Sequence, residues 1–417
     1  MFYEEAVDFM QNLEKFGSSY GLETVRALLR RLGNPQESLK FIHIAGTNGK
    51  GSTSCFITNI LLANGYCVGT FNSPSVFGYN ERFLLDGKAI DNGSVAKYVS
   101  IVAEERAKMI GEGLSAPTAF EIEFAVAMLI FKDSDCDFAV LECGLGGRLD
   151  ATNCIPKKEV AIITAISYDH TAILGDTLEA IANEKAAIAT DCPLITFRQC
   201  DEVMEVFEKA SDLRICPDAK LISADVNGQY FEYRQEKYFI RQLGVYQLQN
   251  CSLAIECAKT LAEKGYAISD ENIKKGIASA IWKGRLQLIN KNSKTFLLDG
   301  AHNPDGALSL AKALKDYFSD KKKCFVFGMF SDKDIDGVLA NIGQLADEFI
   351  TVKPLSKRGL DANATLEKCK KYQPRSQSAQ SIEEAIKDAY LGDCPLIVVC
   401  GSLSILNDAL NAINNLN

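Results

Sequence analysis

The 417-residue sequence has no long hydrophobic run, no excess of basic residues and only three histidines. Its longest uninterrupted apolar segment runs from Phe124 to Phe131, whereas about 18 residues are needed to cross a bilayer. We therefore expect neither a transmembrane helix nor a membrane partner. The 45 Lys and Arg residues against 54 Asp and Glu residues give a net charge of −9. A surface that binds nucleic acid normally needs a basic excess, so no nucleic-acid partner is expected.

The sequence also lacks the marks of a secreted or metal-clustering protein. Its start, MFYEEAVDFMQNLEKF, has neither the basic beginning nor the continuous apolar stretch of a secretory signal. The 14 cysteines are scattered, and no two are spaced as C-x2-C or C-x4-C. Several of them, such as Cys143 and Cys257, lie in apolar patterns where a thiol packs like a small hydrophobic group. We expect a cytoplasmic protein with reduced, structural cysteines.

Short apolar runs alternate with amphipathic helical patterns, which is typical of an α/β fold with parallel sheets covered by helices. The segment 221–240 interrupts this pattern and predicts an aromatic-rich hairpin with Asn227-Gly228 as its turn. After Trp282 the strand-helix alternation restarts. We therefore predict two domains, residues 1–290 and 291–417, with the boundary near Lys291 in the polar stretch NKNSK.

The most specific feature is GTNGKGS, which directly follows a predicted strand and opens a predicted helix. Glycines let backbone N–H groups turn around a phosphate, the helix N-terminus adds its positive end, and a lysine reaches the outer phosphates. The spacing differs from the strict G-x4-GK pattern, and a glycine-rich turn without a ligand is the alternative. The order strand, loop, lysine, helix predicts a phosphate-binding loop made by Gly46, Thr47, Asn48, Gly49, Lys50, Gly51 and Ser52.

Three further side chains follow predicted strands or lie in a predicted helix. Glu142 ends the apolar strand FAVLE, and a carboxylate there can hold Mg²⁺ beside a nucleotide, because ligands of open α/β sheets bind outside the carboxyl ends of strands. His170 comes after the strand VAIITAIS and reaches the same edge if the two strands are neighbours. A solvated acid and a core histidine are the alternatives. Composition alone predicts that Lys185 is a surface lysine beside Glu184.

A last group of polar residues lies around the predicted domain boundary. Asn250 lies in YQLQN, Arg285 in WKGR, and Asp299 and His302 in LDGAHNPDG. An arginine there can close over phosphates, and an acid at a strand end can accept hydrogen bonds from ribose hydroxyls. The alternatives are an interdomain salt bridge for Arg285 and a cap of the helix beginning near Pro304 for Asp299.

Taken in order, these motifs resemble those of the folylpolyglutamate synthases and dihydrofolate synthases of the Mur ligase superfamily, nearly from end to end. The motifs that carry the resemblance are LGNPQ, AGTNGKGS, SP with NER, LECGLGGRLDATN, ITAISYDHTAILGDTLEAIANEKAAI, WKGRLQ, LDGAHNPDGA and GMFSDKD. The resemblance implies a Mur ligase-like α/β fold, with an N-terminal P-loop NTPase-like domain built on a parallel sheet and a smaller Rossmann-like C-terminal domain.

The resemblance also implies the activity, which is that of an ATP-dependent carbon-nitrogen ligase forming ADP. L-Glutamate would be added to dihydropteroate, giving dihydrofolate, and to the γ-carboxylate of reduced folates, through an acyl phosphate. The cofactors would be two Mg²⁺ ions with Lys185 as a carbamate, and we expect a monomer. The implied metal ligands are Ser73, Glu142, His170 and Lys185, and the residues assigned to catalysis are Lys50, Lys185 and His170. The implied ATP contacts beyond the loop are Asn250, Arg285, Asp299 and His302, and the implied substrate contacts are Thr118, Phe120, Glu121, Leu149, Asp150 and Ala151.

The sequence departs from the family pattern at three positions. Ser75 stands where members usually have a histidine after Ser-Pro, Lys283 replaces the proline of WPGR, and Ala187 replaces the glycine of EKAGI. Asp150 has a structural alternative, in which it only caps the turn before the next strand. Two other functions stay open: a cell-wall peptide ligase, against which GKGS and LDATN argue, and a non-catalytic nucleotide switch.

Overall fold

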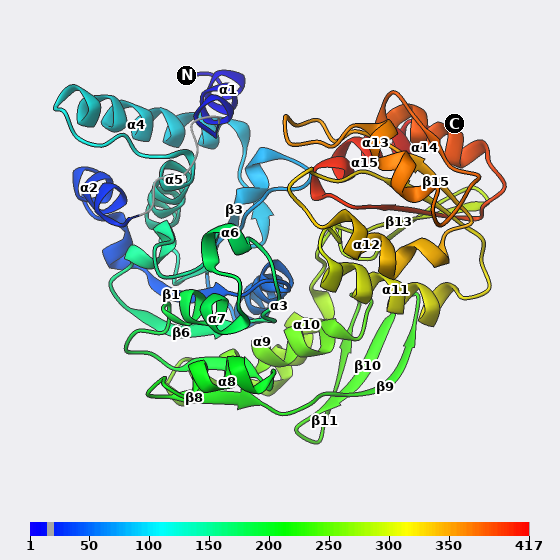
Figure 1. Ribbon diagram of the computed structural model, residues 1–417. Helices are drawn as coiled ribbons and strands as arrows, with labels where there is room; N and C mark the ends of the chain where they lie inside the picture. The colour runs from blue at the N-terminus through cyan, green and yellow to red at the C-terminus, as the bar shows by residue number, and fades with distance from the viewer. Residues whose placement is uncertain (15–20, 417) are drawn as a thin grey trace. The chain divides into compact units, whose positions relative to one another are not determined.

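The computed structural model describes residues 1–14 and 21–416. The chain folds into two compact units, and the residues of each unit contact mainly one another. The first comprises 1–220, 231–239 and 248–280, and the second comprises 221–230, 240–247 and 281–417 (Figure 1). In the described part of the chain, no helix is long and apolar enough to cross a bilayer.

The first unit is built on an eight-stranded sheet in the order β4-β3-β2-β5-β1-β6-β7-β8. Strands β2, β5, β1, β6, β7 and β8 are parallel, and β3 and β4 add an antiparallel edge. Their bounds are β1 Lys40–Ala45, β2 Val68–Phe71, β3 Phe83–Leu85, β4 Lys88–Ala89, β5 Phe138–Glu142, β6 Lys158–Ile163, β7 Leu194–Phe197 and β8 Leu213–Cys216. The central strands are buried on both faces, which explains why they read as continuous apolar runs.

Helices cover both faces of this sheet (Figure 1). Their bounds are α1 Tyr3–Glu14, α2 Glu23–Arg31, α3 Lys50–Ala63, α4 Asn92–Gly111, α5 Ala119–Asp133, α6 Thr171–Leu174, α7 Leu178–Ala186, α8 Asp201–Phe207, α9 Tyr246–Glu263 and α10 Asp270–Ser279. Short 3₁₀ helices are η1 Pro35–Ser38, η2 Tyr79–Arg82 and η3 Ala151–Cys154. Helix α5 packs its apolar side chains with α2 and α4 in one core, whereas α7 and α8 belong to a second core on β1, β6 and β7.

The aromatic segment predicted as one hairpin forms a three-stranded sheet instead. Strands β9 Lys220–Asp225 and β10 Gly228–Tyr233 are joined by a turn at Val226 and Asn227, one residue before the predicted Asn227-Gly228 turn. Strand β11 Glu236–Ile240 lies on the other side of β10. The prediction missed the second turn because it is formed by Arg234 and Gln235, which adopt positive φ values of 49° and 67° without being glycines.

The second unit contains a six-stranded sheet in the order β12-β13-β17-β14-β15-β16. Its elements are β12 Gln287–Lys291, β13 Lys294–Leu298, α11 Pro304–Phe318, β14 Lys323–Phe327, α12 Ile335–Ile342, η4 Gly343–Leu345, β15 Glu348–Thr351, α13 Ala362–Cys369, β16 Gln377–Ser378, α14 Ile382–Leu391, β17 Leu396–Cys400, η5 Leu403–Ile405 and α15 Leu406–Asn414. The polar stretch at Lys291, where we placed the boundary, forms the β12–β13 turn, whereas the division by contacts falls after Ala280. A polar turn between two strands has the same composition as a linker between domains, so the sequence alone does not distinguish a turn from a linker.

All 14 cysteines lie in the described part of the chain, and none of them forms a disulfide there. Most are buried among apolar side chains, and burial raises the pKa of Cys216 and Cys369 to about 12. These thiols pack as small hydrophobic groups.

Candidate functional site

The predicted phosphate loop connects the central strand β1 to the N-terminus of α3. Gly46 and Gly49 adopt φ values of 145° and 96°, which residues with a side chain rarely adopt. A Cβ on Gly46 would lie 1.8 Å from Thr164 Oγ1, so the loop also needs glycine for its close approach to the chain after β6. Thr47 fixes this approach: its N–H donates to the Ala165 carbonyl at 2.7 Å and its hydroxyl to the Ser167 carbonyl at 3.0 Å. The loop is therefore held in shape by the neighbouring strand connection.

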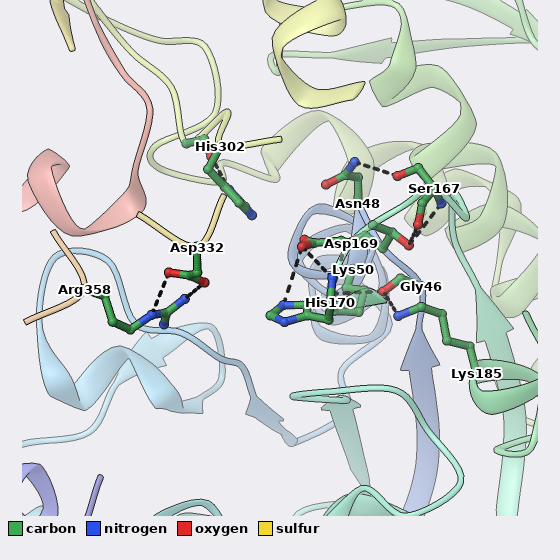
Figure 2. A network of polar contacts seen from close by, with 12 residues as sticks. Gly46, Asn48, Lys50, Ser167, Asp169, His170, Lys185, His302, Asp332 and Arg358 are labelled. Carbon is green, nitrogen blue, oxygen red and sulfur yellow. Dashed lines mark hydrogen bonds and ion pairs between the residues drawn. The ribbon is translucent and has the colours of Figure 1, made fainter. Parts of the chain in front are cut away.

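Lys50 lies at the start of α3 and folds back over the loop. Its Nζ donates to the Gly46 carbonyl at 3.1 Å (Figure 2). It also donates to the Thr47 carbonyl at 3.2 Å and lies 3.8 Å from Glu142 Oε1. Glu142 ends β5, which pairs with β1, and its side chain is buried. The structure thus brings a cation and a carboxylate together beside the phosphate loop.

Lys185 lies in α7 and points to the same loop. Its Nζ donates to the Gly46 carbonyl at 2.9 Å, and only 5% of the residue is exposed (Figure 2). The alternative of a solvated surface lysine is therefore wrong. Burial, and then the nearby charge of Lys50, lower the pKa of Lys185 to about 7. The lowered pKa favours the neutral, nucleophilic amine more than in an exposed lysine.

His170 and Ser73 follow the ends of two other strands in the same sheet. His170 has a φ of 51°, precedes the single-turn helix α6 and is exposed, so it is no core histidine. Its Nε2 lies 3.9 Å from Asp169 Oδ1. The strands that precede Glu142 and His170 are not neighbours, because β1 lies between β5 and β6. Since β2, β5, β1 and β6 are parallel and adjacent, Ser73, Glu142, the phosphate loop and His170 all follow carboxyl ends at one edge.

The candidate substrate residues Leu149, Asp150 and Ala151 belong to the loop that follows Glu142. Asp150 is 6% exposed, and its two oxygens accept hydrogen bonds from the N–H groups of Leu145 and Thr152 at 2.9 and 3.0 Å. Burial raises the pKa of Asp150, and these hydrogen bonds oppose the rise. Asp150 thus caps η3, as the structural alternative proposed, and its pterin contact stays a prediction.

The other candidate substrate residues lie at the start of α5. Thr118 and Glu121 form a reciprocal capping box, in which the Thr118 N–H donates to Glu121 Oε2 at 2.8 Å and the Glu121 N–H donates to Thr118 Oγ1 at 3.3 Å. The Phe120 ring packs at a tilt of 41° against Phe71 and lies over Gly144, where a Cβ would be 2.7 Å from the ring. The two segments named for the substrate therefore contact each other through Phe120 and Gly144.

A contact between this loop and α7 was not apparent from the sequence. The Arg148 N–H donates to the Glu184 carbonyl at 2.8 Å, and the two side chains form an ion pair at 2.9 Å. A Cβ on Gly147 would lie 2.7 Å from the Glu184 carbonyl oxygen and 2.9 Å from that of Lys185. The loop after Glu142 thus lies directly on the backbone that carries Lys185.

Asn250 of α9 completes the surroundings of the phosphate loop in the first unit. The residue is buried, and its Oδ1 would lie 2.4 Å from a Cβ on Gly49. Asn250 therefore packs against the loop backbone at the glycine immediately before Lys50.

The remaining candidate nucleotide residues lie together in the second unit. Asp299, at the end of β13, accepts hydrogen bonds from the N–H groups of Leu286 and Ala301, both at 2.9 Å. The Arg285 guanidinium covers Gly300, where a Cβ would be 1.9 Å from its Nη1, and His302 Nδ1 lies 2.8 Å from the Gly300 carbonyl. Burial raises the pKa of Asp299, and Arg285 opposes this. The alternative role of Asp299 as a helix cap is wrong.

The cap of α11 is Asn303, whose Oδ1 accepts the Gly306 N–H at 2.8 Å. The sequence carried the signal for it, because Asn followed by Pro is a common beginning of a helix. A second unpredicted pair joins two loops of this unit: Arg358 binds Asp332 of the GMFSDKD motif at 2.5 Å (Figure 2). The Arg358 guanidinium also lies over the Phe330 ring. The motif is therefore held by side chains of a loop far along the chain.

Comparisons with known proteins agree with this arrangement. Residues 44–258 match the Mur ligase middle domain, and residues 284–403 match the Mur ligase glutamate ligase domain. The dihydrofolate synthase/folylpolyglutamate synthase of Bacillus subtilis is 34% identical over 82% of this chain and 83% of its own length. The dihydrofolate synthase/folylpolyglutamate synthase of Escherichia coli is 31% identical over 98% of this chain and 94% of its own length.

Solved structures give the same result. A Thermotoga maritima folylpolyglutamate synthase superposes with a TM-score of 0.87 at 30% identity, over 99% of this chain and 97% of that one. E. coli FolC in complex with DHPP and ADP has a TM-score of 0.85 at 30% identity, over 98% of this chain and 97% of the FolC chain. The chain thus belongs to the Mur ligase family, among the ATP-dependent, ADP-forming glutamate ligases that comprise the dihydrofolate synthases and folylpolyglutamate synthases.

Proposed function

We propose that this chain is a bifunctional enzyme that adds L-glutamate both to dihydropteroate and to the γ-carboxylate of reduced folates. The observation that carries the proposal is the meeting of Lys50, Glu142 and Lys185 at a phosphate loop, next to the loop that ends at Asp150. Two relatives named for both activities match 82% and 98% of the chain.

The reaction needs an activated carboxylate, because a carboxylate itself is a poor electrophile. ATP transfers its γ-phosphoryl group to the substrate carboxylate and gives an acyl phosphate and ADP. Lys50 and the N–H groups of the loop stabilise the charge that moves during this transfer. The free amine of glutamate then attacks the acyl carbon, loses a proton, and expels phosphate from a tetrahedral intermediate. The product is an amide.

Of the side chains proposed to bind Mg²⁺, Ser73 and Glu142 fit the ion's preference for oxygen, whereas His170 would bind through nitrogen. Ser73 and Glu142 offer a hydroxyl and a carboxylate at one sheet edge, and His170 follows the end of β6 there. Among the described residues no three His, Cys, Asp or Glu side chains cluster closely enough to hold a metal ion by themselves. Substrate phosphates and water would therefore complete the coordination, as is usual for Mg²⁺. Bound Mg²⁺ would neutralise phosphate charge during the transfer.

The carbamate proposed for Lys185 would supply a further oxygen ligand. An ammonium group repels Mg²⁺, whereas the adduct of a neutral amine with CO₂ is anionic and resembles a carboxylate. The buried Nζ lies within hydrogen-bond distance of the phosphate loop, where a second Mg²⁺ would bind with His170. A related bifunctional synthase structure contains Mn, AMPPNP and L-glutamate, which supports a divalent metal and these two substrates here.

The nucleotide is proposed to contact the loop Gly46–Ser52 and Asn250, together with Arg285, Asp299 and His302. In this proposal the first unit binds the phosphates, and the second unit, which contains the match to the glutamate ligase domain at residues 284–403, forms the glutamate ligase part. The complexes of E. coli FolC with DHPP and ADP and of Mycobacterium tuberculosis folylpolyglutamate synthase with ADP support this assignment. We propose a cytoplasmic monomer.

The test measures phosphate release and product mass with ATP, Mg²⁺ and glutamate. Dihydropteroate, a reduced folate and a UDP-linked peptide are offered in separate reactions. Glutamate addition to the first two, and none to the third, is the expected result. Extension of the reduced folate without ligation of dihydropteroate would reduce the protein to a folylpolyglutamate synthase. Activity only on the UDP-linked peptide would identify a cell-wall ligase, and ATP binding without any ligation would contradict an enzyme of this type.

A further inference from the structure

A chain of buried polar groups lies beneath the loop Gly144–Ala151, and no step of the proposed reaction uses it. Its first member, His43, lies in the middle of β1 and is completely buried. Along a strand, alternate residues share a face, so His43 lies on the same side of the sheet as Phe41 and Ala45. Phe41 belongs to the core beneath α5 and Ala45 to the core beneath α7 and α8. A polar ring thus separates two apolar cores.

The imidazole makes its contacts through one nitrogen. His43 Nε2 lies 2.7 Å from Thr152 Oγ1 and 3.1 Å from Cys143 Sγ. Thr152 Oγ1 in turn donates to Asp150 Oδ1, which also accepts the Thr152 N–H. The other Asp150 oxygen accepts the Leu145 N–H. These contacts join β1 to both ends of the loop.

The hydrogen bonds determine where the imidazole proton lies. Thr152 uses its single hydroxyl proton on Asp150, so its oxygen can only accept from His43. His43 Nδ1 is buried and has no hydrogen-bond partner in the described residues. A proton on Nδ1 would be an unpaired buried donor, which is more costly than an unpaired ring acceptor. The proton therefore lies on Nε2, and the donation runs from His43 to Thr152 to Asp150.

We propose that His43 is a positioning residue for the folate substrate: its Nε2–H holds Thr152 and, through it, the Asp150 carboxylate that fixes the loop Gly144–Ala151. This inference rests on the proposed function, because that loop is the one assigned to the pterin. The loop also lies on the Glu184 and Lys185 carbonyls, so its shape affects the position of α7 as well. The phosphate loop, in contrast, is held by Thr47 and the chain after β6. His43 should therefore govern the folate substrate more than ATP.

The proton position can be measured directly. Only three histidines occur in the sequence, so ¹⁵N-histidine labelling gives a simple spectrum. We expect one imidazole to show the neutral Nε2–H tautomer throughout pH 6 to 8, and its signals to disappear in His43→Gln. An Nδ1–H tautomer or a charged ring at position 43 would overturn the proposal.

The kinetic test compares His43→Met with His43→Gln. The two side chains have similar length and shape, but only glutamine keeps an N–H donor near the position of Nε2. We expect His43→Met to raise KM for dihydropteroate at least tenfold while KM for ATP changes less than twofold, and His43→Gln to recover most of the loss. Equal changes in both KM values, or equal behaviour of the two variants, would show a purely structural role and overturn the proposal.

Thermal unfolding of each variant sets the assay temperature below its transition. If His43→Met does not fold, Thr152→Val replaces it, because it removes the hydroxyl that links His43 to Asp150, and the same KM criterion applies, with Thr152→Ser as its control. The wild type separates this inference from the proposed function. A wild type that ligates neither folate substrate refutes the function, whereas an active wild type with unchanged KM values in His43→Met or Thr152→Val refutes only the role of His43.

Discussion

Gly147→Ala tests whether the loop after Glu142 positions the helix that carries Lys185. The added Cβ would lie 2.7 Å from the Glu184 carbonyl oxygen and 2.9 Å from that of Lys185, whereas ordinary contacts begin at 3.4 Å. The loop and α7 must therefore separate by about 0.5–0.7 Å, the differences between these values. Both obstacles are backbone atoms, so no side chain can rotate away.

The structure allows the size of the effect to be worked out. Overpacking of this kind costs about 1–3 kcal/mol. The hydrogen bond from the Arg148 N–H to the Glu184 carbonyl would lengthen from 2.8 Å to about 3.5 Å, with a loss of about 1 kcal/mol. We expect the free energy of unfolding to fall by roughly 2–4 kcal/mol. A displacement of Lys185 by a comparable distance should lower kcat by about tenfold to a hundredfold, since misplacement by about 1 Å can cost about 10²-fold.

Gly111→Ala is the matched control, because a Cβ at this last residue of α4 meets nothing within 4 Å. Alanine is the better helix former, so this variant should be as stable as the wild type or slightly more so. Urea unfolding and glutamate ligation are measured on both variants. If Gly147→Ala matches Gly111→Ala in both, the tight packing of the loop on α7 is refuted. If it loses stability but keeps kcat, the contact is structural and does not position Lys185.

Three further predictions concern single side chains. Lys50→Ala should lower turnover by about 10²–10³-fold in a variant that still folds, because Lys50 acts on phosphate from the start of α3 and is not part of the apolar core; ample activity on the folded variant would contradict this. Burial lowers the pKa of Lys185 from 10.5 to about 7, so between these values the unfolded chain binds more protons and the stability of the wild type should rise with pH relative to Lys185→Met. Urea unfolding of both proteins in CO₂-free buffer at pH 7 and 9.5 checks this, and parallel pH dependences would refute it. Asp150→Ala should lose the η3 cap and about 1–2 kcal/mol of stability, and it should impair dihydropteroate ligation more than folate extension; equal loss of both activities would limit Asp150 to its structural role.

Local patterns predicted the strand, the glycine-rich loop and the helix around Lys50. A strand, a glycine-rich turn, a lysine and a helix are fixed by residues adjacent in the chain, and β1, the loop and α3 follow in that order. The alternation of strands and helices likewise predicted the α/β architecture. What the sequence could not show is strand order: we considered the strands before Glu142 and His170 as neighbours, but β1 pairs with both. Pairing between apolar strands carries almost no local signal.

Contacts between distant segments account for the rest. Gly147 packs against the Glu184 carbonyl, and the Thr152 N–H donates to Asp150. Both contacts depend on backbone positions that the tertiary fold sets. From the sequence alone, Gly147 cannot be distinguished from the other glycines of the GLGGRLD loop. In the structure its backbone needs no positive φ, and it is the nearness of the α7 backbone that leaves no room for a side chain.

Lys185 shows that part of the missing signal was present in another form. Composition suggested a surface lysine, yet Lys185 lies four residues after Ile181, which is completely buried, and therefore on the same face of α7. A helix that must bury this face cannot place an ammonium there without a loss of solvation, unless a polar group receives it. The Gly46 carbonyl does so from the start of the phosphate loop. The lysine on the apolar face of α7 therefore needs a polar partner inside the fold, and the first residue of the phosphate loop provides it.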